Sequence, residues 1–217
     1  MLEIIYKDTD IVIIRKPYGL DCQYQIPQLL KQQLNCDIYT VHRLDTIVTG
    51  VMVFCLNQKS AAILSKEITE KVFKKEYLAI IEGCFKEQQN KLTDLLFHDK
   101  RVNKTYVVKK KRKGVKEALL EYRQLCSINN NSLLLIRLLT GRTHQIRVQL
   151  ASRNHPIIGD GKYGSNDNGK IQLFCYHISF VHPTNQMVMD FKLLPNQSLL
   201  FDTFKNHLKE GELCEKY

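Results

Sequence analysis

The residues best suited to chemistry surround one carboxylate, Asp45, within the segment 41–50. Asp45 follows Arg43 by two residues and precedes the apolar run 51–55. The β-branched and aromatic residues of that run predict a buried strand, so Asp45 is expected on a polar loop that leads into the core. A carboxylate held by a rigid strand can act as a nucleophile or as a general base. The alternative interpretation is a turn aspartate, with Arg43 as a surface charge.

A second polar cluster follows the apolar run 133–139, at residues 141–147. Residues 145–152 have helical character, and Thr143 is a suitable N-cap residue for them. The start of a helix offers unpaired backbone donors and a partial positive charge. This corner therefore predicts an anion site that also includes Arg142, His144 and Arg147. The side chain of Arg147 is expected to point either into a cleft or toward solvent.

Two further features attract attention. Tyr77 opens the apolar part of the predicted strand 73–81. It is either a functional residue or a core or edge tyrosine with its hydroxyl group in water.

Six of the eight residues in the segment 109–116 are Lys or Arg. Gly114 within it predicts a hairpin turn between strands at 105–108 and 118–125. This basic tip is either a contact for phosphates or a solvated loop.

Composition narrows the class of protein. The chain has 217 residues, 44% of them hydrophobic, and a net charge of +10, which favours a polyanionic partner, most often nucleic acid and otherwise an anionic membrane. Seven widely spaced cysteines without a Cys-x-x-Cys pair argue against a zinc site and against a disulfide framework. The N-terminus does not have the pattern of a signal peptide, and the sequence has no apolar run of about 20 residues. We therefore expect a soluble protein of the reducing cytoplasm.

Hydrophobic periodicity predicts the elements that position these residues. One domain of mixed α and β structure is the simplest interpretation, with helices on a largely antiparallel sheet. The polar residues 86–103 predict no regular element. Strands are expected at 2–6, 11–14, 51–55, 73–81, 105–108, 118–125, 133–139, 172–180 and 187–192, and helices at 26–34, 58–72, 145–152 and 198–209.

Together these motifs resemble the RluA family of RNA pseudouridine synthases. The resemblance spans roughly residues 3–196, and the motifs occur in the family's order. Residues 42–45 with Gly50 resemble its catalytic-aspartate motif, 73–79 its tyrosine motif, and 141–148 its arginine motif. The segments 6–20, 155–164 and 182–183 also fit the family.

The resemblance implies an α+β fold with a mainly antiparallel mixed β-sheet, bisected by a central catalytic cleft and flanked by helices. It implies isomerisation of uridine in ribosomal or transfer RNA, with no metal and no organic cofactor. Asp45 would be the catalytic carboxylate, Arg147 would pair with it and keep it ionised, and Tyr77 would stack on the base. The expected RNA-binding residues are His42, Arg43, Arg142, Thr143, His144, Lys109, Lys110, Lys111, Arg112 and Lys113.

The resemblance also implies that residues 1–217 form a single catalytic domain without a separate N-terminal RNA-binding domain. We expect a monomer. Two positions depart from the family pattern: Val48 stands where threonine is usual, and Gln149 where histidine is usual. One alternative is therefore an inactive RNA-binding or ribosome-associated protein on the same fold. Another is a metal-dependent phosphotransfer enzyme or nuclease, in which Asp160 would approach Asp45.

Overall fold

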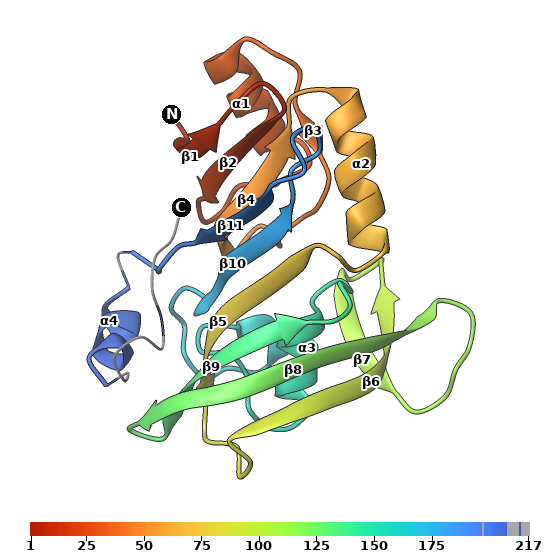
Figure 1. Cartoon of the computed structure of the whole chain (residues 1–217). Coiled ribbons are helices and arrows are strands. Elements are labelled where there is room, and N and C mark those ends of the chain that lie inside the picture. Colours follow the sequence, from red (N-terminus) through yellow and green to blue (C-terminus); the bar gives the residue numbers. More distant parts are fainter. Residues whose placement is uncertain (197, 208–212, 214–217) are drawn as a thin grey trace. The chain divides into compact units, whose positions relative to one another are not determined.

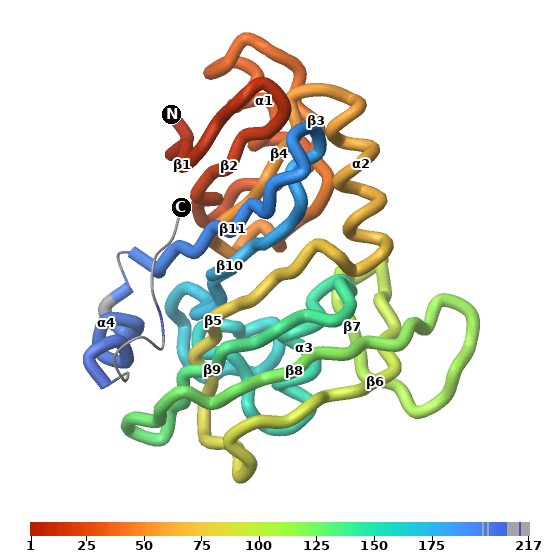
Figure 2. Tube along the Cα trace, viewed as in Figure 1, coloured from red at the N-terminus to blue at the C-terminus, as the bar shows by residue number. Residues whose placement is uncertain are grey.

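A computed structural model describes residues 1–196, 198–207 and 213, and these fall into two compact units. Unit 1 contains Met1–Glu76 and Phe174–Asn196, and unit 2 contains Tyr77–Leu173 and the described residues after 196 up to 207. Figures 1 and 2 trace both units along the chain. The expectation of a single catalytic domain stays a prediction.

The sheet of unit 1 follows the order β1-β2-β4-β10, with β11 paired to β10 and β3 paired to β4. Its pairings are antiparallel except that of β4 with β10, which is parallel. The predicted hairpin at the start of the chain is confirmed by the pairing of β1 with β2. The strands are β1 (Glu3–Lys7), β2 (Ile11–Lys16), β3 (Tyr39–Thr40), β4 (Thr49–Cys55), β10 (Leu173–Val181) and β11 (Val188–Lys192).

The centre of unit 1 is formed by β2 and β4, which are buried on both faces. Residues 11–14 and 51–55 are all 0% exposed. Such continuous apolar runs are typical of strands covered on both sides. Two of the described helices belong to this unit, α1 (Gln25–Leu34) and α2 (Gln58–Thr69). The second ends before the predicted Val72, because Lys71 adopts a left-handed conformation and leaves Val72 exposed.

The sheet of unit 2 follows the order β5-β9-β8-β6-β7. Its strands are β5 (Lys74–Glu82), which begins in unit 1, and β6 (Gln89–Asp99), β7 (Lys104–Val108), β8 (Val115–Ile128) and β9 (Asn131–Leu138). Helix α3 (Gln145–Ala151) and the short 3₁₀ helix η1 (Gly161–Tyr163) pack near β6 and β7. Leu96, Ala118 and Val148 form a buried cluster there, with Tyr163 against it.

Two predictions for unit 2 are wrong. The polar residues 86–103 contain strand β6, in which Leu92 and Leu96 are the buried apolar side chains. The sequence of β6 has no apolar alternation, and the strand is instead stabilised by pairing with β7 on one edge and β8 on the other. The basic segment is not a hairpin tip either. Both β7 and β8 are antiparallel to β6 and lie on opposite sides of it, so residues 109–114 form a crossover between them.

The last described helix, α4 (Leu199–Lys205), agrees with the predicted start of the closing helix. The Ser198 hydroxyl group accepts the backbone N–H of Phe201 and caps it. Phe201 and Phe204 of this helix are buried, whereas Leu200 is only half-buried. The end of the predicted helix, residues 208–209, lies outside the described residues.

The α+β class and the mainly antiparallel sheet are confirmed. The central cleft stays a prediction. Among the described helices, none is both long enough and apolar enough to cross a lipid bilayer.

Candidate active site

In unit 1, Asp45 lies half-buried on the loop that leads into β4, as the sequence predicts. The backbone carbonyl of Asp45 accepts the N–H of Val48 at 2.9 Å, which closes a turn around the carboxylate. The loop is therefore a defined structure directly before strand β4, whose residues 50–55 are buried.

Lys16 holds this loop from inside the protein. Its side chain is 0% exposed, and its ammonium group donates to the carbonyls of Val48 at 2.8 Å and of Thr46 and Pro17 at 3.0 Å each. Burial lowers the pKa of Lys16 to about 8, although nearby acidic groups, including Asp45, act in the opposite direction. Lys16 therefore places a buried positive charge against the backbone of the loop that carries Asp45.

The chain after Lys16 adds two more contacts to the same loop. The backbone N–H of Gly19 donates to the Thr46 carbonyl at 2.9 Å. The Cys22 thiol donates to the Leu44 carbonyl at 3.2 Å, and burial raises the pKa of that thiol. Segment 16–22 thus restrains the backbone on both sides of Asp45.

The glycine of the aspartate motif has a steric role. Gly50 has a φ of 130°, and a Cβ atom there would overlap the carbonyl oxygen of Cys175 on β10. Only glycine fits at this second position of β4. Val48, the first departure from the family pattern, is buried and gives its carbonyl to Lys16, so the restraint works through the backbone and not through the missing hydroxyl group.

The two residues before Leu44 differ in exposure. Arg43 is exposed, as an RNA-binding residue requires. His42 is buried inside unit 1, where Nε2 accepts the backbone N–H of Val53 at 3.2 Å and the ring packs on Phe73. Burial, with a smaller effect of Lys75, lowers the pKa of His42 well below its usual value. This geometry gives His42 a structural contact, and its role in RNA binding stays a prediction.

In unit 2, Arg147 lies in α3 and is buried. Its guanidinium group donates two bonds of 2.7 Å to the carboxylate of Asp160, which is 1% exposed. The guanidinium carbon also lies 5.0 Å from the ring centre of Tyr163. A two-pronged buried ion pair fixes the plane of the guanidinium group. The predicted pairing of Arg147 with Asp45 stays a prediction.

Tyr163 links this pair to the start of α3. Its hydroxyl oxygen accepts the backbone N–H of Thr105 at 2.8 Å and lies 2.8 Å from Nδ1 of His144. Burial raises the pKa of Tyr163, so the hydroxyl group stays protonated and can donate to His144. The ring therefore connects β7, α3 and η1.

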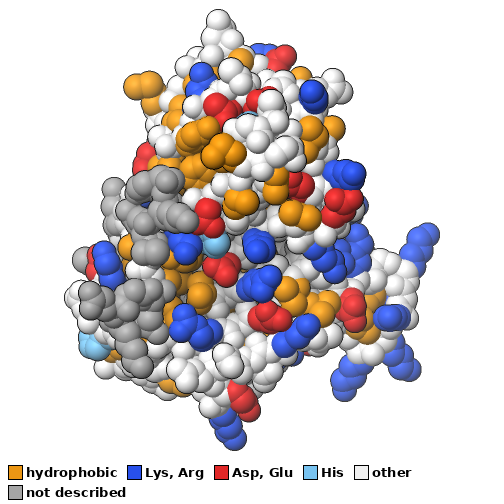
Figure 3. Space-filling view, in the orientation of Figure 1, with side chains coloured by type: hydrophobic (Ala, Val, Ile, Leu, Met, Phe, Trp, Pro, Cys, Tyr) orange, Lys and Arg blue, Asp and Glu red, His pale blue; other side chains and the backbone are white. Residues whose placement is uncertain are grey.

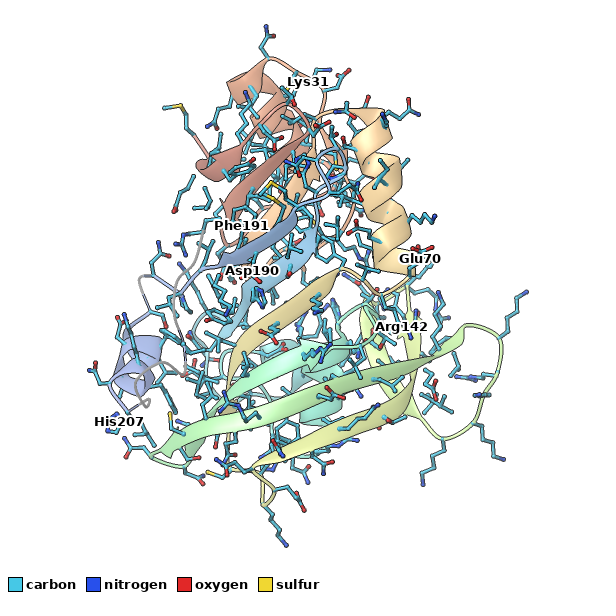
Figure 4. All side chains as sticks on the ribbon, in the orientation of Figure 1. Lys31, Glu70, Arg142, Asp190, Phe191 and His207 are labelled. Carbon is cyan, nitrogen blue, oxygen red and sulfur yellow. The ribbon has the colours of Figure 1, made fainter. Side chains whose placement is uncertain are left out.

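The predicted N-cap Thr143 is wrong. His144 occupies the cap position, with a φ of 54° and no capping bond from its side chain. The side chain of Gln145 instead accepts the backbone N–H of Arg142 at 3.0 Å, and the Thr143 carbonyl accepts the Thr105 hydroxyl group. Protein groups thus occupy this corner, which weakens the argument for an anion site there. Arg142 lies half-buried beyond it, with Nε donating to the Glu117 carbonyl (Figure 4).

Gln149, the second departure from the family pattern, is fully buried in α3. Its amide nitrogen donates to the carboxylate of Asp94 at 2.8 Å, which ties the helix to β6.

The buried Tyr77 follows Lys75 by two residues along β5. Burial lowers the pKa of Lys75, whose ammonium group lies 5.6 Å from the ring centre of Phe73.

The basic crossover, residues 109–113, is exposed throughout. Figure 3 shows the cationic side chains of this region as a group at the right-hand edge of the view. One of them, Arg112, also contacts the folded sheet: its guanidinium carbon lies 4.8 Å from the ring centre of Phe97 on β6.

One group of described side chains has the spacing of a metal site. Asp8, Asp10 and His182 bring ligand atoms within 4.8 Å of one another in unit 1. Protein groups already use them: His182 Nδ1 accepts the N–H groups of Thr184 and Asn185, and its Nε2 contacts Asp8 at 2.9 Å. These contacts connect the turn after β1 to the segment after β10.

Sequence reasoning did not identify Lys16 or Tyr163 as candidate residues, and it named Asp160 only in the metal-dependent alternative. The one local signal was Lys16 itself, a charged residue directly after four buried apolar residues and Arg15. The pairing of Asp160 with Arg147 and the contact of Tyr163 with Thr105 had no local signal, because these partners lie 13 and 58 residues away in sequence.

Comparison with known proteins identifies the family to which this chain belongs and a solved structure with the same fold. Residues 10–152 match the family described as RNA pseudouridylate synthase. The chain is similar to ribosomal large subunit pseudouridine synthase C of Buchnera aphidicola, with 32% identity over 84% of this chain and 63% of the relative. It is also similar to tRNA pseudouridine synthase C of Haemophilus ducreyi, with 29% identity over 96% of this chain and 98% of the relative.

The chain spans less than two thirds of the length of the Buchnera relative. Among solved structures, human RNA Pseudouridylate Synthase Domain Containing 4 has the same fold, with a TM-score of 0.79, 20% identity, and coverage of 95% of this chain and 94% of that one.

Proposed function

Because this chain belongs to the RNA pseudouridylate synthase family, we propose that it converts uridine in RNA to pseudouridine and that Asp45 is its catalytic carboxylate. The observation that carries the proposal is the restraint on the Asp45 loop. A fully buried ammonium group binds three carbonyls of the loop and its neighbouring segment. Such fixed geometry is what positioning a reactive group requires.

The reaction breaks the bond from ribose C1′ to uracil N1 and forms a bond from C1′ to C5. C5 loses its hydrogen as a proton, N1 gains one, and no electrons are transferred. The proposal assigns to Asp45 the covalent attack on the nucleotide or the removal of a sugar proton. Arg147, whose guanidinium plane is fixed by Asp160, would keep Asp45 ionised. Tyr77 would stack on the uracil and assist proton transfer.

The proposal also covers how RNA is held. The target uridine must leave its stack, which costs a few kcal/mol and is easiest in a loop. Cations would contact the phosphates: the half-buried Arg142 and the exposed Arg43, Lys109, Lys110, Lys111, Arg112 and Lys113. The names of the relatives support ribosomal or transfer RNA as the substrate class. We further propose a cytoplasmic monomer that needs neither a metal nor an organic cofactor.

The first test is release of tritium from RNA labelled at uridine C5, with total RNA from cells that lack this protein. Wild type should release tritium, and Asp45→Asn should not, because the amide is neither nucleophile nor base. Asp37→Asn is the matched control, since Asp37 is an exposed partner of Lys31 in the same unit. Failure of wild type to release tritium from any RNA would reject the proposal.

A further inference from the structure

Strands β6 and β7 carry two aromatic rings on one face of unit 2. Phe97 of β6 lies directly opposite Tyr106 of β7 in the antiparallel register. Residues that are directly opposite point to the same side of a sheet, so the two rings are neighbours. Lys104, two residues before Tyr106 in β7, lies on this side as well. We call Phe97, Tyr106 and Lys104 the aromatic platform.

The opposite face of the same strands is already used. Leu96 points to it and belongs to the buried cluster with Ala118 and with Val148 of α3. By alternation, the platform faces away from α3. The side chain of Tyr106 is accordingly 42% exposed, although aromatic rings usually bury most of their surface.

Cations lie over both rings of the platform. The ammonium group of Lys104 is 6.0 Å from the ring centre of Tyr106 and 5.5 Å from that of Tyr163. Arg112 of the basic crossover lies over Phe97, at 4.8 Å. The crossover therefore folds back onto the edge of the platform, and Gly114 allows this turn with its φ of 85°.

The charge around the platform is strongly one-sided. Residues 99–117 contain nine Lys or Arg residues and two carboxylates, in a chain whose net charge is +10. One of the two carboxylates, Asp99, is paired with Arg101 through both of its oxygens. The ligand that fits must combine flat apolar rings with regularly spaced negative charges.

We propose that the aromatic platform binds a single-stranded segment of RNA, with a base stacked on Tyr106 and its phosphates on Lys104 and the basic crossover. Exposed aromatic rings interleaved with cations are the usual means of holding single strands without reading their sequence. The inference rests on the proposed function only in that the ligand is RNA. It concerns a flanking segment and not the uridine that reacts.

The chain contains no tryptophan, so Tyr106→Trp creates a single fluorescent reporter. A twelve-nucleotide oligoadenylate should quench it saturably, whereas an RNA duplex of equal length should quench it weakly because its bases are already stacked. The matched control is Tyr24→Trp, since Tyr24 is 73% exposed and belongs to unit 1. Absence of quenching in Tyr106→Trp, or equal quenching in both variants, would overturn the proposal.

Binding by variants gives a second measurement. Tyr106→Ala should weaken oligoadenylate binding about tenfold, and Tyr106→Phe should retain it, because stacking needs the ring and not the hydroxyl group. Tyr24→Ala should leave binding unchanged. Equal affinity of Tyr106→Ala and wild type would contradict the platform. Stronger quenching of Tyr106→Trp by anionic vesicles than by RNA would assign the surface to a membrane instead.

The two proposals fail separately. Quenching of Tyr106→Trp by oligoadenylate without tritium release by wild type would leave the RNA platform standing and reject the isomerase. Tritium release that depends on Asp45, without quenching of Tyr106→Trp, would support the isomerase and reject the RNA platform.

Discussion

At the scale of single residues, Lys16 has the clearest consequence for activity. Lys16→Met keeps the length of the side chain but removes its bonds to the Val48 and Pro17 carbonyls, whereas Thr46 retains the N–H of Gly19. The lost contacts destabilise the fold, but the desolvation cost of the ammonium group is also removed. We therefore expect the catalytic rate to fall by about 100-fold while stability changes little. Single-turnover tritium release and urea unfolding measure the two quantities.

The pH dependence of stability distinguishes this role from simple packing. Folded Lys16 releases its proton near pH 8, but the unfolded side chain keeps it up to about 10.5. Between these values the unfolded state binds more protons, so the Lys16 contribution to the free energy of unfolding rises with pH. Wild type should thus gain stability relative to Lys16→Met from pH 8 to 10.5. A difference that is flat across this range would mean that Lys16 is not a buried cation.

His42 predicts an effect in acid. Its folded pKa lies well below 6.5, so from pH 6.5 downward the unfolded state takes up a proton that the folded state refuses. The free energy of unfolding should therefore fall as pH drops below about 6.5. His42→Gln should remove this part of the slope, because an amide oxygen can still accept from Val53. His207→Gln is the control, since His207 is exposed, and an unchanged slope in His42→Gln would contradict the burial of a neutral ring.

How far the sequence leads is also visible at this scale. Asp45 was predictable as a loop residue, because the apolar run after it has to be a strand. The burial of His42 was not, since nothing local distinguishes it from the exposed Arg43 beside it. Lys16 reaches the loop across 30 and 32 residues of sequence, and such contacts leave no periodic pattern.

At the scale of elements, the Arg147–Asp160 pair fastens α3 to the loop that ends in η1. Breaking a buried pair by removing one partner leaves an uncompensated charge and costs about 3–5 kcal/mol. Asp160→Asn and Arg147→Met should each lose about this much stability, and the double variant should lose much less than their sum. Chemical unfolding of the four proteins measures the coupling. Additive losses would show that the two charges do not depend on each other.

Activity should behave differently from stability in the same four proteins. If Arg147 also pairs with Asp45 during catalysis, the double variant should stay inactive even where its stability is partly restored. Tritium release at a temperature where all four proteins are folded makes this comparison. Recovery of activity in the double variant would give Arg147 a structural role alone.

Elements with strong apolar patterns, such as β4 and β9, were predicted within a few residues. Strand β6 was missed because it gains its stability from pairing with β7 and β8 on its two edges. The same topology turned the expected hairpin at Gly114 into a crossover. Strand order depends on pairing between distant segments, and local periodicity does not report it.

At the scale of the whole molecule, the uneven distribution of charge predicts how RNA binding responds to salt. Each phosphate contact on a single strand contributes about 0.7 to the slope of log affinity against log salt. Replacing Lys109, Lys110 and Lys111 by glutamine should therefore lower the slope by up to about two. The control replaces Lys59, Lys66 and Lys71, which are exposed in unit 1 and change the net charge equally. Equal slopes for the two triple variants would mean that net charge attracts RNA without a defined surface, whereas a loss confined to the first would locate the polyanion on the crossover.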